Sequence, residues 1–464
     1  MKVTVLGAGG VRAPMLVRSF IRRQARLGLD ELALMDIDGG RLELMAALTT
    51  PLLAAHPPRF RLTYTTDAKA ALAGADFVIT TFRVGDMAAR AVDERVALDL
   101  GVIGQETTGP GGYAMGLRTL PVLFGYLDVM RQVCPEAWLL NFANPAGMLA
   151  EAVIHDGGWE RAVGICDGPA GLQREAAALL GVPASALHLD YFGLNHLGWA
   201  RGAWHQGRDR LPELIERIEQ AAEAGGHAPG FPFAPGQVAA LGMLPNEYLY
   251  YYYSPNAVEN LRRAGRTRGE QLLALNTQLY ADLQRAHAAE DFEALQTIFA
   301  RYHAARGATY FMAETGGGAT QATEAQAQAS APPETDDEGY AGVALNVMEA
   351  LAGTSSGPQT MVLNVANRGA IEGMRANEVV ETVCWVSRGL IRPLAVGAVP
   401  DHALGLMKQV KAYERLTIEA ALTGSYRAAL AALVLHPLVP SAELARRLLD
   451  MYIERHGALL PRLR

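Results

Sequence analysis

The chain has 464 residues, of which 50% are hydrophobic, and a formal net charge of -7 at pH 7. A chain of this length usually divides into two domains, and its apolar content is enough to fill their cores. The acidic balance and the lack of basic runs argue against nucleic acid or an anionic membrane surface as a partner. Chemistry on a small molecule is therefore the favoured class of function.

The cysteines and the apolar runs bear on where the protein works. Cys134, Cys166 and Cys384 are few and far apart, which argues against a disulfide framework and for a reducing compartment. The chain starts directly with a strand-like run, without the charged and apolar regions of a signal peptide. No apolar run reaches the roughly 20 residues that span a bilayer. We expect a cytoplasmic protein that does not enter a membrane.

The first segment, residues 3–10 (VTVLGAGG), is an apolar, β-branched run that ends in closely spaced glycines. This pattern is typical of a buried parallel strand, a tight turn and a helix whose N-terminal amides hold a pyrophosphate. Gly7, Gly9 and Gly10 are therefore candidate dinucleotide-binding residues. The fingerprint is incomplete, because Arg12 stands where the third glycine would be, and an ordinary strand–helix turn is the alternative.

The second predicted strand, residues 31–38 (ELALMDID), ends in carboxylates. Asp36 lies roughly where a ribose-binding acid is expected, and Asp38 is the alternative for that role. A carboxylate at this place favours NAD over NADP, because it would repel a 2′-phosphate.

Helices and strands alternate up to about residue 204, and the rest of the chain is mainly helical. Helices are predicted at residues 13–28, 41–55, 271–306, 402–422 and 441–456, strands at 76–81, 137–142, 163–166, 187–192 and 361–365, and a mobile loop at 315–339. The alternation predicts an α/β protein with an N-terminal Rossmann-like parallel sheet. We expect an NAD-binding domain at residues 1–200 and a C-terminal mixed, mainly helical α+β domain for substrate binding, catalysis and oligomerisation at residues 201–464.

Polar residues follow several predicted strands, and the carboxyl ends of parallel strands line a ligand crevice. Cys166 and His196 each close a strand, so they are candidate thiolate and imidazole ligands of a divalent ion. Ordinary core packing is the alternative for both. Asn144, just before a proline, is a candidate for binding sugar hydroxyls, and Asn195 ends a further strand.

Three other segments have both a functional and an ordinary interpretation. Residues 101–112 (GVIGQETTGPGG) suit a loop that brings backbone close to a ligand, or a surface turn. Tyr248 lies in a cluster of tyrosines, for which aromatic packing is the alternative. Arg268 is either an anion-binding guanidinium or part of a solvated helix start.

A set of short motifs occurs together along the whole chain. They are GAGG (7–10), MDID (35–38), RVG (83–85), ARAVDER (89–95), GVIGQETTGPGG (101–112), NFANPA (141–146), ICD (165–167), GLNH (193–196), PNEY (245–248) and NRGAI (367–371). Together they resemble the NAD- and metal-dependent glycoside hydrolases of family 4, most closely the 6-phospho-β-glucosidases.

The resemblance implies a role for each candidate. Cys166 and His196 would hold the metal. The resemblance implies that this metal is manganese, although a thiolate ligand by itself favours zinc. Tyr248 would be the catalytic base. The residues implied in substrate binding are Arg90, Asn144, Asn195 and Arg268, the last toward a phosphate, and those implied in NAD binding are Gly7, Gly9, Gly10, Val11, Arg12 and Asp36.

The implied chemistry is redox, unlike that of glycosidases with two carboxylates. Oxidation at carbon 3 of the sugar by NAD acidifies the carbon 2 proton, which Tyr248 removes; elimination, addition of water and return of the hydride complete hydrolysis. Removal by a tyrosine of ordinary pKa, about 10, needs the metal as a Lewis acid. Asp167 is a candidate acid for the leaving oxygen, or else orients a metal-bound water.

Two departures from the family pattern bear on the substrate. The usual serine after the glycines is missing, and Arg12 is the candidate to replace its phosphate contact. The β-specific members usually have Cys-Asn, whereas Cys166-Asp167 is the pairing of the 6-phospho-α-glucosidases. We expect a phosphorylated β-glucoside such as cellobiose 6-phosphate as substrate, and a homodimer or homotetramer. The alternatives are an α-linked or unphosphorylated glycoside, a plain NAD-dependent sugar dehydrogenase and a non-catalytic sensor.

Overall fold

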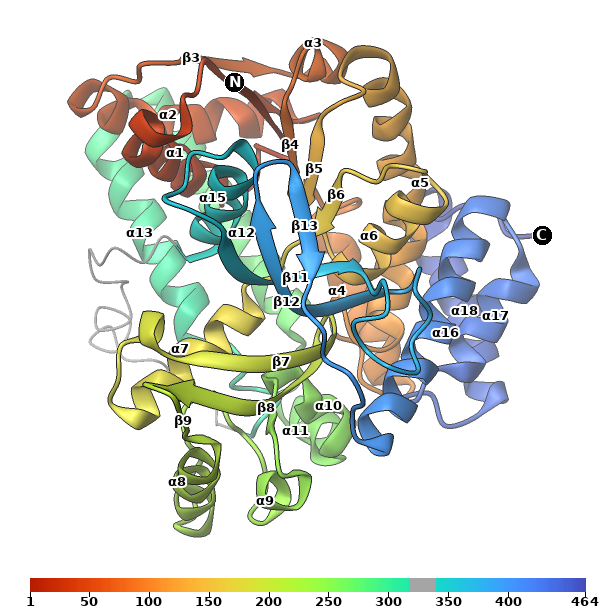
Figure 1. Ribbon diagram of the computed structural model, residues 1–464. Helices are drawn as coiled ribbons and strands as arrows, with labels where there is room; N and C mark the ends of the chain where they lie inside the picture. Colours follow the sequence, from red (N-terminus) through yellow and green to blue (C-terminus); the bar gives the residue numbers. More distant parts are fainter. Residues whose placement is uncertain (317–338) are drawn as a thin grey trace.

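The computed structural model describes residues 1–316 and 339–464 (Figure 1). Within these residues one mixed sheet has the strand order β10-β8-β7-β12-β11-β6-β5-β4-β1-β2-β3, with β13 beside β12 and β9 beside β8. The loop predicted at residues 315–339 lies almost entirely outside the described residues.

The N-terminal part of the sheet is parallel. Its strands are β1 (Lys2–Leu6), β2 (Glu31–Met35), β3 (Arg61–Thr65), β4 (Phe77–Thr80), β5 (Trp138–Asn141) and β6 (Ala162–Gly164). Their order, β3-β2-β1-β4-β5-β6, is that of the doubly wound dinucleotide-binding fold. The predicted Rossmann-like sheet is confirmed.

Helices cover both faces of this parallel part, because its strands are apolar on both sides. Val5 and Ile79 face a core that includes α1 (Ala13–Leu27), α2 (Gly39–Ala55), α12 (Arg268–Ala288), α13 (Phe292–Ala308) and α15 (Gly339–Ala352). Leu6 and Val78 face the opposite core, which includes α3 (Ala68–Leu72), α4 (Asp86–Asp99), α5 (Pro110–Val133) and α6 (Ala146–His155). Burial on both faces is what a parallel sheet requires.

The C-terminal part of the sheet is antiparallel. β11 (Gln359–Ala366) and β12 (Val379–Ser387) lie between β6 and β7 (His188–Leu194), and β7 forms a hairpin with β8 (Leu197–His205). The prediction that residues 187–192 continue the parallel series is therefore wrong, because strands from the far end of the chain insert before β7. The predicted domain boundary at residue 200 falls within β8, and the division into domains stays a prediction.

The remaining elements complete the C-terminal half. α16 (Asp401–Thr423), α17 (Tyr426–Leu435) and α18 (Ala442–His456) pack beside α4 and α5 (Figure 1). The other short elements are α7 (Gly168–Leu180), α8 (Leu211–Glu223), α9 (Gln237–Leu241), α10 (Tyr250–Tyr253), α11 (Asn256–Ala264), β9 (Arg208–Asp209), β10 (Leu244–Pro245), β13 (Leu390–Pro393), and the 3-10 turns η1 (Ala184–Ala186), η2 (Glu247–Leu249) and η3 (Gly457–Leu459). The predicted helix at 271–306 is divided into α12 and α13.

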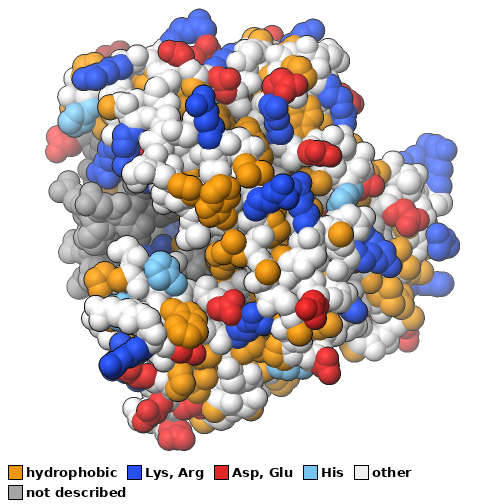
Figure 2. Space-filling model, in the orientation of Figure 1, with side chains coloured by type: hydrophobic (Ala, Val, Ile, Leu, Met, Phe, Trp, Pro, Cys, Tyr) orange, Lys and Arg blue, Asp and Glu red, His pale blue; other side chains and the backbone are white. Residues whose placement is uncertain are grey.

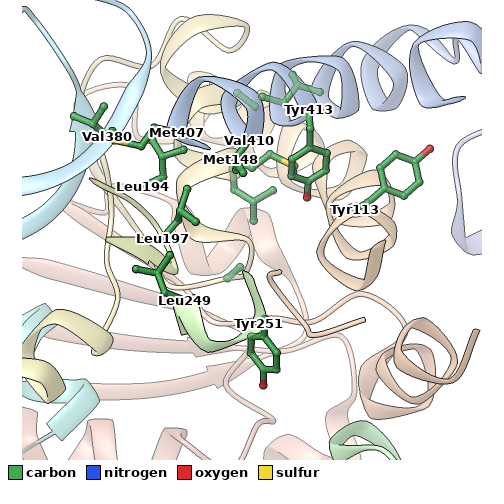
Figure 3. Close-up of a cluster of buried hydrophobic side chains, with 14 of the residues drawn as sticks. Tyr113, Met148, Leu194, Leu197, Leu249, Tyr251, Val380, Met407, Val410 and Tyr413 are labelled. Atoms are coloured by element: carbon green, nitrogen blue, oxygen red, sulfur yellow. The ribbon is translucent and has the colours of Figure 1, made fainter. Parts of the chain in front are cut away.

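A cluster of buried apolar side chains holds the β7–β8 hairpin. Leu194 and Leu197, which flank its turn, lie in one cluster with Val380 of β12 and with Met407 and Val410 of α16 (Figure 3). Each of these side chains is at most 5% exposed. The turn is thus anchored by packing on both sides.

The surface and the helices add two observations. On the face shown in Figure 2, acidic and basic side chains are interspersed. Within the described ranges, every helix is too short or too polar to cross a membrane.

Candidate active site

A cavity of about 410 Å³ collects side chains from both halves of the chain. The predicted site residues that line it are Arg12, Arg90, Asn144, Cys166, Asp167, His196, Tyr248 and Arg268. The other predicted NAD-binding residues lie in and beside the turn that leads to Arg12; they are Gly7, Gly9, Gly10, Val11 and Asp36. Asn195 does not line the cavity and is buried behind it.

The first turn fits a dinucleotide. Gly7 has φ +99°, and a Cβ on it would lie 2.5 Å from the backbone nitrogen of Phe82. A Cβ on Gly9 would lie 2.8 Å from Cγ of Asp36. α1 then starts at Ala13 without a side chain capping its N-terminus. A close-packed glycine turn that leads into an uncapped helix is what pyrophosphate binding needs.

The two candidate ribose acids have different partners. The Asp36 carboxylate accepts a hydrogen bond from the Gly9 N–H (2.7 Å), so it lies against the turn. The Asp38 carboxylate accepts one from the Arg41 N–H (3.0 Å) and so caps α2. The geometry favours Asp36 for the ribose.

The candidate metal ligands reach the cavity from different elements. Cys166 follows β6, and its Sγ accepts a hydrogen bond from the Gly168 N–H at 3.4 Å. His196 is the second residue of the two-residue turn between β7 and β8, with φ +61°. A non-glycine residue in this region is strained, and such strain gathers at functional sites.

These two side chains fit a divalent cation. The buried Nδ1 of His196 has no hydrogen-bond partner among the described residues. Burial lowers the pKa of His196 to about 4, so the ring is neutral and able to coordinate a metal at neutral pH. Burial, Glu381 and Asp167 raise the pKa of the Cys166 thiol, so a cation is needed to hold its thiolate. Among the described residues, no group of three or more His, Cys, Asp or Glu side chains could hold a metal ion.

Tyr248 lies directly on His196. Its ring stacks on that of His196, with centroids 3.6 Å apart and an angle of 2°. Its hydroxyl is 3.0 Å from that of Tyr310, which donates to the Glu247 carboxylate (2.7 Å). Burial, Tyr310 and Glu247 raise the pKa of Tyr248, so the expectation of an ordinary pKa is wrong. A nearby cation is required for Tyr248 to act as a base at neutral pH.

Two guanidinium groups in the cavity have no carboxylate partner within ion-pair distance among the described residues. Arg268 donates to the Arg306 carbonyl (2.7 Å) and to Thr309, and burial lowers the pKa of Arg268 to about 10. Arg306 donates to the Tyr302 hydroxyl at 3.1 Å. Two guanidinium groups without an ion-pair partner in the described part of the chain fit a bound anion, and the Glu314 carboxylate lines the same cavity.

Arg90 differs from these two arginines. It is buried and pairs with Glu94 at 2.7 Å and with Glu106 at 2.8 Å. Coulombic attraction to these carboxylates raises its pKa against the opposing effect of burial. Arg90 therefore lines the cavity as part of a charge-balanced network that shapes the wall.

The second glycine-rich segment is part of this wall. Gln105 and Glu106 line the cavity, and Gly109 to Gly112 are buried. A Cβ on Gly112 would lie 2.0 Å from the Thr107 carbonyl oxygen, so only glycine fits there. The alternative of a surface turn is wrong, because this loop folds back on itself inside the protein.

Several lining residues were not predicted. His303, Arg306, Tyr310 and Glu314 come from the end of α13 and the turns after it. The sequence shows only helix periodicity there, so no signal singles them out. Glu247 adjoins Tyr248 in the PNEY motif, which is the signal that could have identified it.

The fold and the cavity define a class of protein. A doubly wound sheet with a ligand cavity beside its glycine-rich turn is typical of dinucleotide-dependent enzymes. The sequence model of the family described as "Family 4 glycosyl hydrolase" matches residues 2–182. The family model described as "Family 4 glycosyl hydrolase C-terminal domain" matches residues 191–439. The chain belongs to glycosyl hydrolase family 4.

Relatives in this family act on both anomers. A probable 6-phospho-β-glucosidase of Bacillus subtilis is 32% identical over 99% of this chain and 97% of its own length. A 6-phospho-α-glucosidase from gut microorganisms, solved with NAD and Mn²⁺, has a TM-score of 0.82 and 29% identity, covering 100% of this chain and 99% of its own. The Thermotoga maritima 6-phospho-β-glucosidase, solved with manganese, NAD⁺ and glucose-6-phosphate, has a TM-score of 0.80 and 27% identity, covering 99% of each chain.

Proposed function

We propose that this enzyme hydrolyses 6-phospho-glucosides, the β-linked ones first, with NAD and a divalent metal such as Mn²⁺. The observation that carries the proposal is the stack of Tyr248 on His196 in a cavity that also contains Cys166 and the unbalanced Arg268. Solved relatives that contain NAD, manganese and glucose-6-phosphate support it.

Each part of the site has a task in this reaction. When bound, NAD would supply a reversible hydride acceptor for carbon 3 of the sugar, and the metal would supply a Lewis acid. The turn at residues 7–12 would hold the dinucleotide, and Cys166 and His196 would hold the metal. Asn144 binds sugar hydroxyls.

Tyr248 removes the carbon 2 proton as phenolate. Its hydroxyl hydrogen-bonds with Tyr310, and Tyr310 with Glu247, so the abstracted proton has a hydrogen-bonded route away from the sugar. Burial raises the pKa of Glu247 to about 7, which suits a group that accepts and releases a proton near neutral pH. Tyr310, in the middle of this route, is 48% exposed, so the route is in contact with solvent.

Arg268 and Arg306 are the residues that bind the 6-phosphate of the substrate. Both lie in the cavity wall without a carboxylate partner among the described residues, and a phosphate offers paired acceptor oxygens to a guanidinium. Arg12 lines the same cavity, where it adds positive charge in place of the family's serine.

The α-linked substrate is the second candidate, and Asp167 favours it. This carboxylate lines the cavity beside Cys166, in the pairing that marks the 6-phospho-α-glucosidases. Either anomer passes through the same removal of the carbon 2 proton, so Tyr248 keeps its task in both.

A panel of α- and β-linked nitrophenyl glucosides, with and without the 6-phosphate, tests the proposal. The assay contains NAD, manganese and a reductant, and we expect turnover of the phosphorylated β-glucoside without build-up of NADH. Turnover of the α-linked compound alone would select the second candidate. NADH accumulating one for one with substrate would identify a dehydrogenase, and cleavage at full rate without NAD would refute the redox mechanism.

We also propose a cytoplasmic location and a homodimer or homotetramer. All three cysteines are free in the structure, which supports a reducing compartment.

A further inference from the structure

We propose that Glu381 is a positioning residue for the metal site. Its buried carboxylate fixes Asn195 between the ligands Cys166 and His196 and places a negative charge behind the cation. This inference rests on the proposed function only in assuming that Cys166 and His196 hold a metal.

Glu381 lies between the two strands that lead to the ligands. It is on β12, opposite Gly193 of β7 in one direction and Asn364 of β11 in the other. Asn364 in turn lies opposite Gly164 of β6. His196 follows Gly193 by three residues, and Cys166 follows Gly164 by two. One side chain in the middle of the sheet therefore connects the ends of both ligand-bearing strands.

The Glu381 carboxylate makes three hydrogen bonds, all from neutral donors. It accepts from the Tyr191 hydroxyl at 2.8 Å, from Nδ2 of Asn195 at 3.1 Å and from Nδ2 of Asn364 at 2.9 Å. Glu381 is 1% exposed, and it forms no ion pair with a Lys, Arg or His of the described residues. A buried carboxylate without a cation is costly, so a cation in the adjoining site would offset that cost.

Asn195 connects this carboxylate to the metal ligands. It immediately precedes His196 in the hairpin turn, and its side chain lies close enough to the Cys166 sulfur to favour the thiolate. A Cβ on Gly147 would lie 3.0 Å from Cβ of Asn195, so α6 closes the space behind it. With Glu381 on one side and α6 on another, Asn195 has little freedom, and the turn that carries His196 is held with it.

The charges around the site point the same way. The Asp167 carboxylate lines the cavity next to Cys166, so a second negative charge lies near the proposed cation. A divalent cation would be attracted by both carboxylates. Outer partners of this kind commonly change metal affinity by about 10- to 100-fold when they are replaced.

Glu381→Gln is the variant that separates charge from shape. The buried Oδ1 atoms of Asn195 and Asn364 have no partner among the described residues. If the side-chain amides of Asn195 and Asn364 flip, their Oδ1 atoms accept hydrogen bonds from the amide of the new Gln side chain. The variant then keeps its hydrogen bonds and loses the charge. Tyr191→Phe is the matched control, because it removes one hydrogen bond to Glu381 and keeps the charge.

The experiment measures Mn²⁺ binding to the full-length enzyme with NAD and without substrate, by the electron paramagnetic resonance of free Mn²⁺. We expect Glu381→Gln to raise the Kd for Mn²⁺ at least about tenfold, and Tyr191→Phe to change it less than about threefold. Without metal, Glu381→Gln should melt at the wild-type temperature or higher, and its melting temperature should rise less on addition of Mn²⁺.

Two results would overturn the inference while leaving the proposed function intact. One is a Kd for Mn²⁺ within twofold of wild type in Glu381→Gln. The other is an equal loss of affinity in Tyr191→Phe, which would reduce Glu381 to one member of a hydrogen-bond network. A wild-type enzyme that binds no Mn²⁺ would instead refute the metal site, and this inference with it.

Discussion

Two buried glutamates lie near the start of β12 and differ in the charge of their neighbours. Glu151 of α6 accepts from the Val379 N–H at the start of β12 (2.8 Å), and pairs with Lys411 (2.8 Å) and Arg415 (3.1 Å). Glu381, two residues further along β12, has only neutral donors. The positive neighbours lower the pKa of Glu151 against the effect of burial, whereas burial raises that of Glu381.

This difference distinguishes buried charges that stabilise the fold from buried charges that serve the cavity. Where charges serve only the fold, the structure pairs each with its opposite, because an unpaired buried charge costs stability. In and around the cavity, charged groups lack an ion-pair partner among the described residues: Glu381 lies behind the proposed metal ligands, and Arg268 and Arg306 lie where an anion fits. Unbalanced buried charge is thus a marker of the site.

The largest effect that we expect is on kcat, from replacing Tyr248 in the cavity. Tyr248→Phe should lower kcat about 10²- to 10⁴-fold, because a positioned base is lost, with little change in stability. Wild-type product formed in heavy water should contain deuterium at carbon 2, and Tyr248→Phe should slow this incorporation together with kcat. Tyr253→Phe is the control, since its hydroxyl accepts from Trp199 and does not line the cavity. A Tyr248→Phe enzyme with a tenth of the wild-type kcat would exclude Tyr248 as the base.

On the scaffold side, Lys411→Met should break the balanced cluster. The substitution removes the cation that Glu151 and Glu414 share. We expect it to lower the free energy of unfolding by about 3–5 kcal/mol. Urea denaturation measures this loss, and the affinity for Mn²⁺ should not change. Lys408→Met, on the exposed face of the same helix, is the control. A loss below about 1 kcal/mol would contradict the comparison.

Arg268→Met tests the unbalanced cation. Losing a charged hydrogen bond to phosphate should cost about 1.5–3 kcal/mol, seen as a 10- to 100-fold higher KM for the 6-phospho-glucoside. Any residual turnover of the unphosphorylated glucoside should not change. Arg266→Met, at an exposed position two residues earlier, is the control. Equal losses on both substrates would mean that Arg268 does not bind the phosphate.

The smallest effect is a pH dependence of the scaffold. His436 is buried, its ring packs edge-on against Tyr413, and burial lowers the pKa of His436 to about 3. The unfolded chain, with an ordinary pKa of about 6.5, binds the proton first, so stability falls as pH decreases from 6.5 toward 3. The slope is about 1.4 kcal/mol per pH unit.

His436→Asn should flatten this part of the pH profile of unfolding by urea. Its side-chain oxygen can take the place of Nδ1, which accepts from the Leu438 N–H at 3.1 Å. An unchanged slope between pH 6.5 and 5 would show that His436 is not the titrating group.

The helices and strands predicted from local pattern are mostly those of the structure. The strand at 76–81 became β4, and the helix at 402–422 became α16, because each is fixed by its own apolar periodicity. The strand at 187–192 formed, but its partners were wrong. Pairing depends on β11 and β12, which lie more than 160 residues further along the chain.

By itself the sequence determined the dinucleotide turn, the family and the candidates Cys166, His196 and Tyr248, because these depend on short motifs whose chemistry is local. Only the tertiary structure decided that Tyr248 stacks on His196, that Arg306 and Tyr310 join the cavity, and that Glu381 is buried without a cation. The physical reason is that burial and charge balance are sums over neighbours from distant strands and helices. No stretch of sequence contains that sum.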